Sequence, residues 1–548
     1  MHSFMTQRMH AATLPVRPQR VRKAGTGIFS AAAIVLILVM TAITCPASAF
    51  DGASISEPVW DWKYDAIERL IAAAGKSGGM VMNTRPYSRI EMGQQVLLLE
   101  EYFGNASADG AGNRPANWHH TVLLRRLKAE LAREIALLQD SLPQETHWKA
   151  PRYLRFQAAH TDIPYEIQNQ NGFAVNRYAL RLESSFAVES GAVAAEVRPL
   201  LYYKNESQGG AELAAAYLQF RKNNWGLQVG RDSMWWGPGR RGAVIMSNHA
   251  PAFAMVKLHT FEPYDLPLLG PTSALLFIGS TSRQPVSMAV HEASGQVNYI
   301  EDREPVIMGF RVGFTPFSWL EMGISHVIQA TNRHGEQYQA ADLLQLVLPD
   351  WQKNEDSAYK GLVSNHLQAV DVAFTFGRDF AFVDRLGMEA MKIYIEYGGE
   401  TVYYNAKEGL WLQFPEVLYG LYFDFGRSDL RLEFAINSSY VQWYSHGQFT
   451  EGYRNDGFVM GHHMGGFSKD LTADSGYALD EKNKIGLHFE WHDYFVAETS
   501  TFGGGIDYER ALSDRSRAMV SCQHFRYTGG PYDGGGNTVV TLDYLYDF

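Results

Sequence analysis

The chain has 548 residues, of which 46% are hydrophobic and 20% charged, and its formal net charge is −11. An acidic protein repels phosphates, which excludes nucleic acid as a partner. The mean hydropathy of −0.22 is typical of a soluble protein, but aromatic residues reach 13% and glycine occurs 50 times. Many aromatics and glycines without long apolar runs favour a membrane barrel whose strands alternate lipid-facing and water-facing residues.

Residues 1–49 predict a secretory signal peptide. Basic residues between positions 17 and 23 precede an apolar run at 28–43, and Ala47-Ser48-Ala49 follows. This order of charge, apolar run and small residues is that of an export signal, so we expect cleavage after Ala49. The alternative is a permanent N-terminal anchor, but a run of about 16 residues is near the short limit of a spanning helix.

Cleavage there would change both the charge and the cysteine content. It removes five basic and no acidic residues, which lowers the net charge to about −16. Cys522 then remains as the single cysteine, so neither an internal disulfide nor a cysteine-based metal site is expected.

Residues 50–150 predict a small helical bundle. An apolar-periodic run from Trp60 to Ala74 stops at Gly75, and Ser88 with Glu91 forms an S-x-x-E capping box at the start of a second run. A third helix is expected from about Trp118 to Gln139, with leucines and Ile135 on one face. A helical linker is the alternative, but three successive helices favour a bundle.

From about Tyr153 the periodicity changes from 3.6 to 2, which predicts β-strands over 151–548. Alternating runs surround turns at Asn223-Asn224, 316–318 and 426–429. Strands of about ten residues joined by such turns fit a transmembrane barrel with about 16–18 strands. Because short turns belong in the periplasm, the strand after Asn224 runs outward, which places residues 231–247 at the outer mouth or folded into the lumen.

The two faces of these strands differ in chemistry. One face is apolar and aromatic, and a soluble β-sandwich could also solvate the other. The polar face contains Arg181, Glu183, Glu196, Arg198, Arg221, Arg311, Glu321, Lys392, Glu396, Arg431, Glu433, His488, Glu490 and His492. The C-terminus distinguishes the two folds, because alternating aromatics that end in Phe548 resemble the insertion signal of outer-membrane barrels. We therefore predict an all-β outer-membrane barrel that reaches the barrel-insertion machinery through Phe548.

The most unusual local sequence is Gly230–Arg241, which contains Arg231, Asp232, Trp235 and Trp236 before Gly-Pro-Gly. Indole faces can stack on sugar rings, and Arg or Asp can hydrogen-bond hydroxyls. The alternative is that both tryptophans fill the barrel or lie in the interfacial aromatic girdle. Trp351 and Trp411, with Trp443 and Tyr444, are further candidate sugar contacts in the loops, although packing explains each individually.

Several motifs together resemble the capsule-assembly Wzi family. They are the export signal, the helical-region sequence Asn83–Arg89, Trp-Gly-Pro-Gly at 236–239 followed by Ser247-Asn248, and the terminal Phe548. The resemblance covers about residues 50–548. It implies an 18-stranded barrel with a periplasmic helical bundle at its foot and a lectin-like role in holding capsular or exopolysaccharide at the cell surface.

Enzymatic patterns are weak, and we expect neither catalysis nor a cofactor nor a metal. Ser247 and His249 are nearly adjacent, whereas a nucleophile needs its base across space. The pairs His462-His463 and His119-His120 lack the i,i+4 spacing of a helical zinc site. Glu396, Glu433 and Glu490 could form a glycosidase pair only at about 5–9.5 Å, and lining of a solvated lumen explains them as well.

The sequence thus predicts three segments: a signal peptide (1–49), a periplasmic helical bundle (50–150) and an outer-membrane barrel (151–548) in contact with lipid. We expect a monomer that binds capsular or exopolysaccharide and attaches it to the cell surface. The alternative function is a channel for small solutes or sugars. A porin needs no helical segment before its first strand, and mixed charges in the lumen predict no selective ring.

Overall fold

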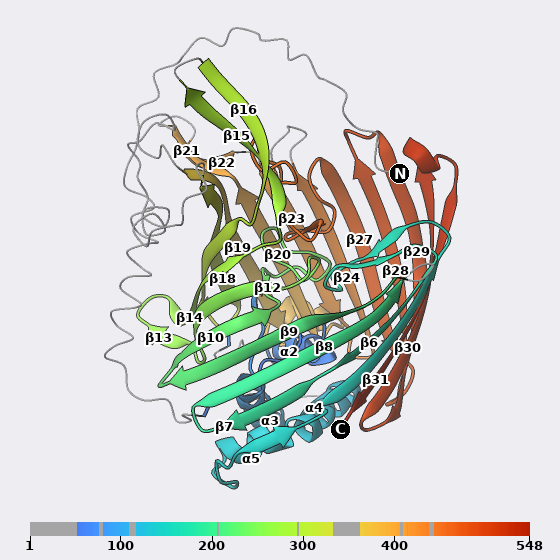
Figure 1. The fold of residues 1–548 in the computed structure, drawn as a ribbon. Coiled ribbons are helices and arrows are strands. Elements are labelled where there is room, and N and C mark those ends of the chain that lie inside the picture. Colours follow the sequence, from blue (N-terminus) through green and yellow to red (C-terminus); the bar gives the residue numbers. More distant parts are fainter. Residues whose placement is uncertain are drawn as a thin grey trace.

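The structure, a computed structural model, describes residues 52–75, 80–108, 117–204, 208–292, 295–332, 362–405, 409–413, 415–437 and 443–548. The predicted signal peptide and Trp351 lie outside these residues. Within them, one antiparallel sheet closes into a barrel of 18 strands (Figure 1), the number that the family resemblance implied. The last strand pairs with the first, with Tyr153 opposite Asp547.

The barrel strands follow one another around the wall in chain order. They are β3 (Tyr153–Thr161), β6 (Tyr178–Ser184) continued by β7 (Phe186–Ser190), β8 (Val193–Lys204), β9 (Gln208–Lys222), β10 (Trp225–Asp232), β12 (Phe253–Thr260), β14 (Gly270–Ser280), β17 (Val306–Phe317), β18 (Leu320–Asn332), β19 (Leu362–Gly377), β20 (Ala390–Gly399), β23 (Glu416–Asp424), β24 (Ser428–Asn437), β27 (Ser468–Ala478), β28 (Asn483–Tyr494), β29 (Thr499–Ser513), β30 (Ser516–Thr528) and β31 (Gly536–Asp547). The predicted change of periodicity at Tyr153 is therefore confirmed.

Shorter strands extend the wall or form hairpins beside it. The wall is extended by β2 (His147–Lys149) and β13 (Tyr264–Leu266). The hairpins are β4 (Tyr165–Ile167) with β5 (Phe173–Val175), β15 (Gln284–Glu292) with β16 (Gly295–Arg303), β21 (Thr401–Asn405) with β22 (Gly409–Gln413), and β25 (Arg454–Asn455) with β26 (Phe458–Val459). Two short helices, α7 (Ala381–Arg385) and η1 (Gly530–Tyr532), lie in connections between wall strands.

The longest connections lie at one end of the barrel and most of the short turns at the other. The predicted turn after β9 is confirmed at 223–224. The turn after β23 lies at 425–427 instead of 426–429, and the turn after β17 lies at 318–319 instead of 316–318, because Pro316 and Phe317 belong to the strand. Because strands alternate in direction, these turns share one end, which we call the helix end. The hairpins β15–β16 and β21–β22 rise from the opposite end, which we call the loop end (Figure 1).

The N-terminal helices begin and end largely where their capping residues predict. Helix α2 (Trp62–Ala74) is capped by Asp61, whose side chain accepts from the backbone of Lys63, and ends at Gly75 with φ of 66°. Helix α3 (Arg89–Ala108) begins with the predicted capping box: Ser88 N–H donates to Glu91 Oε2 at 2.6 Å, and Glu91 N–H donates to Ser88 Oγ at 3.3 Å. The third predicted helix is divided at Leu131 into α4 (Trp118–Glu130) and α5 (Ala132–Leu138).

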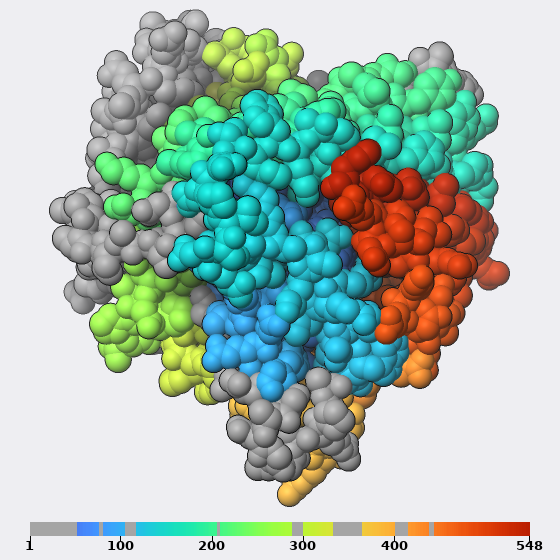
Figure 2. Space-filling model, turned by 90° about the horizontal axis from the view of Figure 1, so that it is seen from below, coloured from blue at the N-terminus to red at the C-terminus, as the bar shows by residue number. Residues whose placement is uncertain are grey.

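These helices close the helix end of the barrel. They share an apolar core that includes Ile67, Leu70 and Leu127, each fully buried. Figure 2 shows blue and cyan atoms of the N-terminal segment in the middle of this face, between the green and red strands of the wall. No helix of the described residues is long and apolar enough to cross a membrane.

Buried ion pairs attach helix α2 to the barrel wall. Glu68 accepts from Lys392 at 2.7 Å and from Arg431 at 3.2 Å, on strands β20 and β24. Arg69 donates to Asp424 at 2.7 Å and to Asp429 at 2.6 Å beside the turn after β23. Neighbouring cations outweigh desolvation and hold the pKa of Glu68 well below its ordinary value. Removing one partner of such a pair is costly because it leaves a buried charge unpaired.

The two faces of the wall have the predicted chemistry. The outward residues are apolar and exposed to the surroundings, for example Leu201, Leu227 and Ile395. The predicted polar-face residues are directed inward and are buried, except His492, which is half-buried. This is the arrangement of a barrel with an apolar lipid-facing band and a polar interior.

Candidate functional site

The segment between β10 and β12, residues 233–252, folds into the lumen, and we call it the plug. The sequence left two positions open for 231–247, and the plug occupies the lumen rather than the outer mouth. Its residues Val244, Ile245 and Met246 are buried with Trp443 and Tyr444 of a second inward segment, residues 443–467, which we call the lumen loop. The barrel interior is therefore filled by protein at the levels of the helices, the plug and the lumen loop.

The two sequence motifs that carried the family resemblance pair with each other inside the lumen. Strand β1 (Thr84–Arg85) and strand β11 (Trp235–Trp236) form a two-stranded antiparallel sheet. The N–H of Gly237 also donates to the carbonyl of Asn83 at 2.9 Å. The wall supports the same junction, because Arg311 donates to Thr84 Oγ1 and to Asp371, both at 2.7 Å.

The plug tryptophans have no face open to a ligand. Trp235 is 2% and Trp236 0% exposed. Trp235 donates through Nε1 to Gly239 O at 3.1 Å, and Trp236 meets Phe277 edge to face at 5.6 Å. The burial of both rings agrees with the alternative interpretation, in which the two tryptophans fill the barrel. A sugar could reach either ring only if the surrounding side chains moved.

The neighbouring charged residues of the motif also make internal contacts. Asp232 is buried and accepts from Arg198 at 2.6 Å. Arg231 is half-buried and donates to the carbonyl of Ala252 at 2.7 Å. Both side chains hold the start of the plug to the wall.

The predicted loop aromatics are dispersed. Trp411 lies in strand β22 near the loop end, whereas Trp443 and Tyr444 are buried at 1% and 4% exposure. Tyr444 donates through its hydroxyl to the carbonyl of Val244 in the plug. The two described side chains therefore join the lumen loop to the plug.

Two of the three wall carboxylates considered for hydrolysis bind the plug backbone, whereas the third, Glu490, accepts from Gln168. Glu433 accepts the N–H groups of Arg240 and Arg241 at 2.6 and 2.7 Å. Glu396 accepts the N–H of Val244 at 3.0 Å. Both carboxylates are buried, so their role here is to position the plug.

Ser247 and His249 do not form a nucleophile and base. The Ser247 hydroxyl donates to Gly461 O at 2.6 Å and accepts from the backbone N–H of His249 at 3.1 Å. The His249 ring is directed elsewhere, with Nε2 at 3.5 Å from Glu166 Oε2.

One side of the lumen is more open than the other. On the β17–β24 side, the inward residues Arg311, Asp371 and Glu396 are buried. On the β27–β31 side, several inward residues are polar and half-buried; they include Asp474, Asp507, Gln523, Thr541 and Asp543. We call this set the polar wall. Protein fills the lumen less completely beside it, which leaves its planar polar groups accessible to solvent.

Arg241 of the plug crosses to the polar wall. Its Nε donates to Asp474 Oδ2 at 2.7 Å, and its Nη2 lies 2.9 Å from His488 Nδ1. The carboxylate of Asp474 raises the pKa of Arg241, more than offsetting the desolvation of the guanidinium. The guanidinium therefore stays charged beside the acidic side chains of the wall.

At the loop end, a mixed aromatic and polar surface continues from the polar wall. We call Tyr165, Glu166, Gln168, His249 and Phe458 the mouth patch. Gln168 donates to both oxygens of Glu490 at 2.8 Å, and Tyr165 stacks on Phe525 at 5.5 Å. Phe458 meets the His249 ring edge to face at 5.7 Å.

The exposure of the mouth patch makes it available to a ligand. The Glu166 side chain is 57% exposed, while Tyr165, Gln168 and Phe458 are half-buried. Planar polar groups next to partly exposed rings can hydrogen-bond and stack on a polyhydroxylated molecule. Sequence reasoning missed this patch because its residues come from three separate segments and share no motif.

A histidine cluster lies behind the mouth patch, where His462, His463 and Asp470 bring potential metal ligands together. Burial lowers the pKa of His462 to about 3 and that of His463 well below its ordinary value. Both imidazoles are consequently neutral near pH 7, the form in which histidine binds metals.

The sequence and the structure were compared with those of known proteins. No curated protein matches the sequence. The structure matches that of Wzi, an outer membrane protein involved in group 1 capsule assembly in Escherichia coli and described as a carbohydrate binding β-barrel. The TM-score is 0.63 at 14% identity, with 89% of this chain and 98% of that chain covered.

Two further solved structures resemble this one less closely. Pseudomonas aeruginosa OccK3 (OpdO) gives a TM-score of 0.41 at 10% identity, covering 75% of this chain and 97% of that one. Acinetobacter baumannii OccAB2 gives 0.42 at 8% identity, covering 72% and 98%. A model of the capsule assembly protein Wzi family matches residues 157–501, which is more than half of the sequence. The chain is an outer-membrane β-barrel that belongs to the Wzi capsule assembly family.

Proposed function

We propose that the protein binds capsular or exopolysaccharide and attaches it to the cell surface. Membership of the Wzi capsule assembly family is the observation that carries this proposal. The Escherichia coli member with a solved structure is described as a carbohydrate binding barrel. The barrel is then a scaffold that presents a glycan-binding surface at its loop end.

The mouth patch and the adjoining polar wall are the best candidates for that surface. Side chains such as Gln168 and Asp474 offer hydrogen bonds to sugar hydroxyls, and Tyr165 and Phe458 offer partly exposed rings. Binding by the predicted residues Arg231, Asp232, Trp235 and Trp236 requires the plug to rearrange, because three of them are buried. Contact by Trp351 and Trp411 stays a prediction.

The same proposal includes the orientation of the barrel in the membrane and the removal of the signal peptide. The signal peptide is removed after Ala49, the helices face the periplasm, and the loop end faces outward. Phe548 is directed to the barrel-insertion machinery, and the mature protein acts as a monomer in contact with outer-membrane lipid. The position of the short turns at the helix end supports this orientation, since short turns of such barrels are periplasmic.

The alternative function is a diffusion channel. Such a channel needs a continuous water-filled path, whereas the helices, plug and lumen loop occupy the interior of this barrel. The weak likeness to Occ-type barrels does not favour the channel, because TM-scores below 0.5 do not establish a common fold.

The decisive experiment is polymer retention in a deletion strain. Cell-bound and released polysaccharide are measured separately, with the deleted and the complemented strain compared. We expect normal synthesis with polymer shed into the medium after deletion. Unchanged retention with reduced uptake of small solutes would instead favour the channel.

Complementation with variants tests the proposed surface. Glu166→Gln and Gln168→Ala are expected to reduce retention and the affinity of the purified barrel for the polymer. Glu304→Gln is the matched control, because its side chain is also 57% exposed and is paired with Arg283, and neither residue belongs to the mouth patch. Equal losses in the Glu304 and Glu166 variants would count against a site at the mouth patch.

A further inference from the structure

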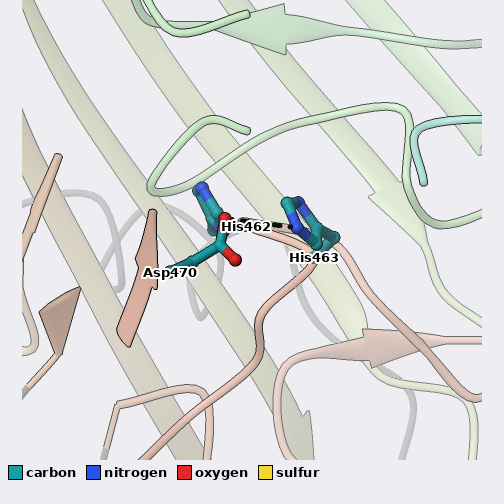
Figure 3. Close-up of side chains that lie close together, drawn as sticks. All are labelled: His462, His463 and Asp470. Atoms are coloured by element: carbon teal, nitrogen blue, oxygen red, sulfur yellow. Dashed lines mark ion pairs between the residues drawn. The ribbon is translucent and has the colours of Figure 1, made fainter. Parts of the chain in front are cut away.

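The histidine cluster lies where the lumen loop leads into strand β27. His462 and His463 belong to the lumen loop, and Asp470 lies near the start of strand β27. Figure 3 shows the three side chains directed toward one another, and one potential ligand atom from each lies within 4.8 Å of the others. His463 and Asp470 are largely buried, with side chains 6% and 3% exposed.

Hydrogen bonding fixes the tautomer of His463. Its Nδ1 lies 2.9 Å from the carbonyl oxygen of Arg241. Because a carbonyl can only accept, Nδ1 must carry the proton, and a neutral ring then has a bare lone pair on Nε2. A hydrogen bond to the non-ligating nitrogen is the usual way in which proteins orient a metal-binding histidine.

The bare nitrogen faces another acceptor. His463 Nε2 lies 3.6 Å from Asp470 Oδ2. Nε2 is buried and receives no hydrogen bond from the described residues, and neither does Asp470 Oδ1. Two buried acceptors that face each other are unfavourable unless a proton or a metal ion lies between them, because a buried polar group without a partner is costly.

The spacing suits a metal ion. Two ligands bound to zinc at about 2.0–2.2 Å in tetrahedral geometry are roughly 3.3–3.6 Å apart. His492 Nδ1 lies 3.5 Å from the second carboxylate oxygen of Asp470, Oδ1. The His492 side chain is 22% exposed, which provides a route from solvent.

The donor set also indicates the class of metal. Imidazole nitrogens favour zinc, copper or nickel, whereas magnesium and calcium prefer oxygen ligands. We propose that His462, His463 and Asp470 bind one divalent transition-metal ion such as Zn²⁺, with a fourth position open to solvent. Coordination by His462 replaces the hydrogen bond that its Nδ1 accepts from the Met464 N–H at 3.3 Å. This ion fastens the lumen loop to strand β27 and, through the Arg241 carbonyl, to the plug.

Metal binding by the purified full-length barrel tests this site. Detergent-solubilised protein is stripped with EDTA, dialysed against Zn²⁺ and analysed for metal content and affinity. We expect one ion per chain and, with Co²⁺ in place of Zn²⁺, the intense visible absorption of a tetrahedral site. Asp470→Asn and His463→Gln should each weaken Zn²⁺ binding by more than about 100-fold, beyond the usual effect of losing an outer-shell partner.

His524→Gln provides the control for adventitious binding. His524 is an exposed histidine on strand β30, and its loss should leave both stoichiometry and affinity unchanged. The proposal would be overturned if the wild type and the Asp470 and His463 variants bound Zn²⁺ with equal affinity. Should these variants fail to assemble, the wild-type Co²⁺ spectrum decides, and absence of tetrahedral bands would overturn it as well.

Discussion

Thr84 lies opposite Trp236 in an antiparallel sheet inside the lumen. Thr84 belongs to the helical segment that closes the helix end, and Trp236 belongs to the plug that fills the lumen. Their pairing therefore connects the helical segment to the plug. Arg311 and Asp371 of the wall hold the same junction. The helices, plug and wall therefore form one packed unit, and several predictions depend on that unit.

Glu68→Gln should destabilise the barrel strongly. Glu68 neutralises Lys392 and Arg431 in a buried environment, and breaking a buried ion pair costs about 3–5 kcal/mol. Asp65→Asn on the same helix is the control: its pair with Arg240 is well exposed, at 46% and 39%, and should contribute less than about 1 kcal/mol. Thermal unfolding, followed by heat-modifiable migration, measures both; similar midpoints for the two variants would show that the buried cluster does not hold α2.

Trp236→Ala should impair assembly rather than glycan binding alone. The ring is fully buried against Phe277, and truncation of a buried aromatic costs about 3–5 kcal/mol. Trp148→Ala, at a side chain 70% exposed, should change stability by less than about 0.5 kcal/mol. If Trp236→Ala assembles with wild-type stability but loses polymer binding, the ring is a sugar contact and the packing explanation is wrong.

Stability should depend on pH through Glu91. Burial raises the pKa of this helix α3 carboxyl from 4.5 to about 7, so between these values the folded state binds more protons than the unfolded state. Its contribution is therefore fully present below about pH 4.5 and is lost as the pH rises through about 7. Relative to Glu91→Gln, wild type should lose about 1–3 kcal/mol between pH 5 and pH 8.

The comparison with Glu91→Gln removes the effect of other groups that titrate. Burial lowers the pKa of His119 to about 3, which acts in the opposite direction, since the unfolded state then binds more protons below pH 6.5. This effect is common to both proteins and cancels in the difference. A difference that stays constant from pH 5 to pH 8 would mean that Glu91 is not protonated in the folded protein.

Purified protein in planar bilayers should show negligible conductance. The plug and lumen loop share one buried core with Tyr394 and Leu418 of the wall, so ions meet packed side chains instead of a pore. Glycines substituted for Tyr444 and Trp443 together should loosen this core and produce leak currents. Steady porin-sized steps from the unaltered protein would show that the lumen opens.

Sequence alone determined the class of the protein and most of its local structure. Alternation with period 2 separates lipid-facing from lumen-facing residues whatever the neighbouring strand is, so the faces and many turns were predictable. The Ser88–Glu91 capping box acts within four residues and fixed the start of α3 correctly. The family resemblance supplied the number of strands, which the alternation of residues along the sequence left between 16 and 18.

Tertiary structure alone decided where the inserted segments lie. No periodicity indicates that residues 233–252 and 443–467 fold inward, because their contacts are made with distant strands. The chemistry of Trp235 and Trp236 allowed both sugar contact and packing, with packing favoured, and only their burial in the lumen separates the two roles. The histidine cluster likewise depends on Asp470, which the sheet register brings opposite His492 and the returning lumen loop brings to His463. The contacts of the plug arise from chain closure over long sequence separations, whereas patterns in a sequence report interactions between near neighbours.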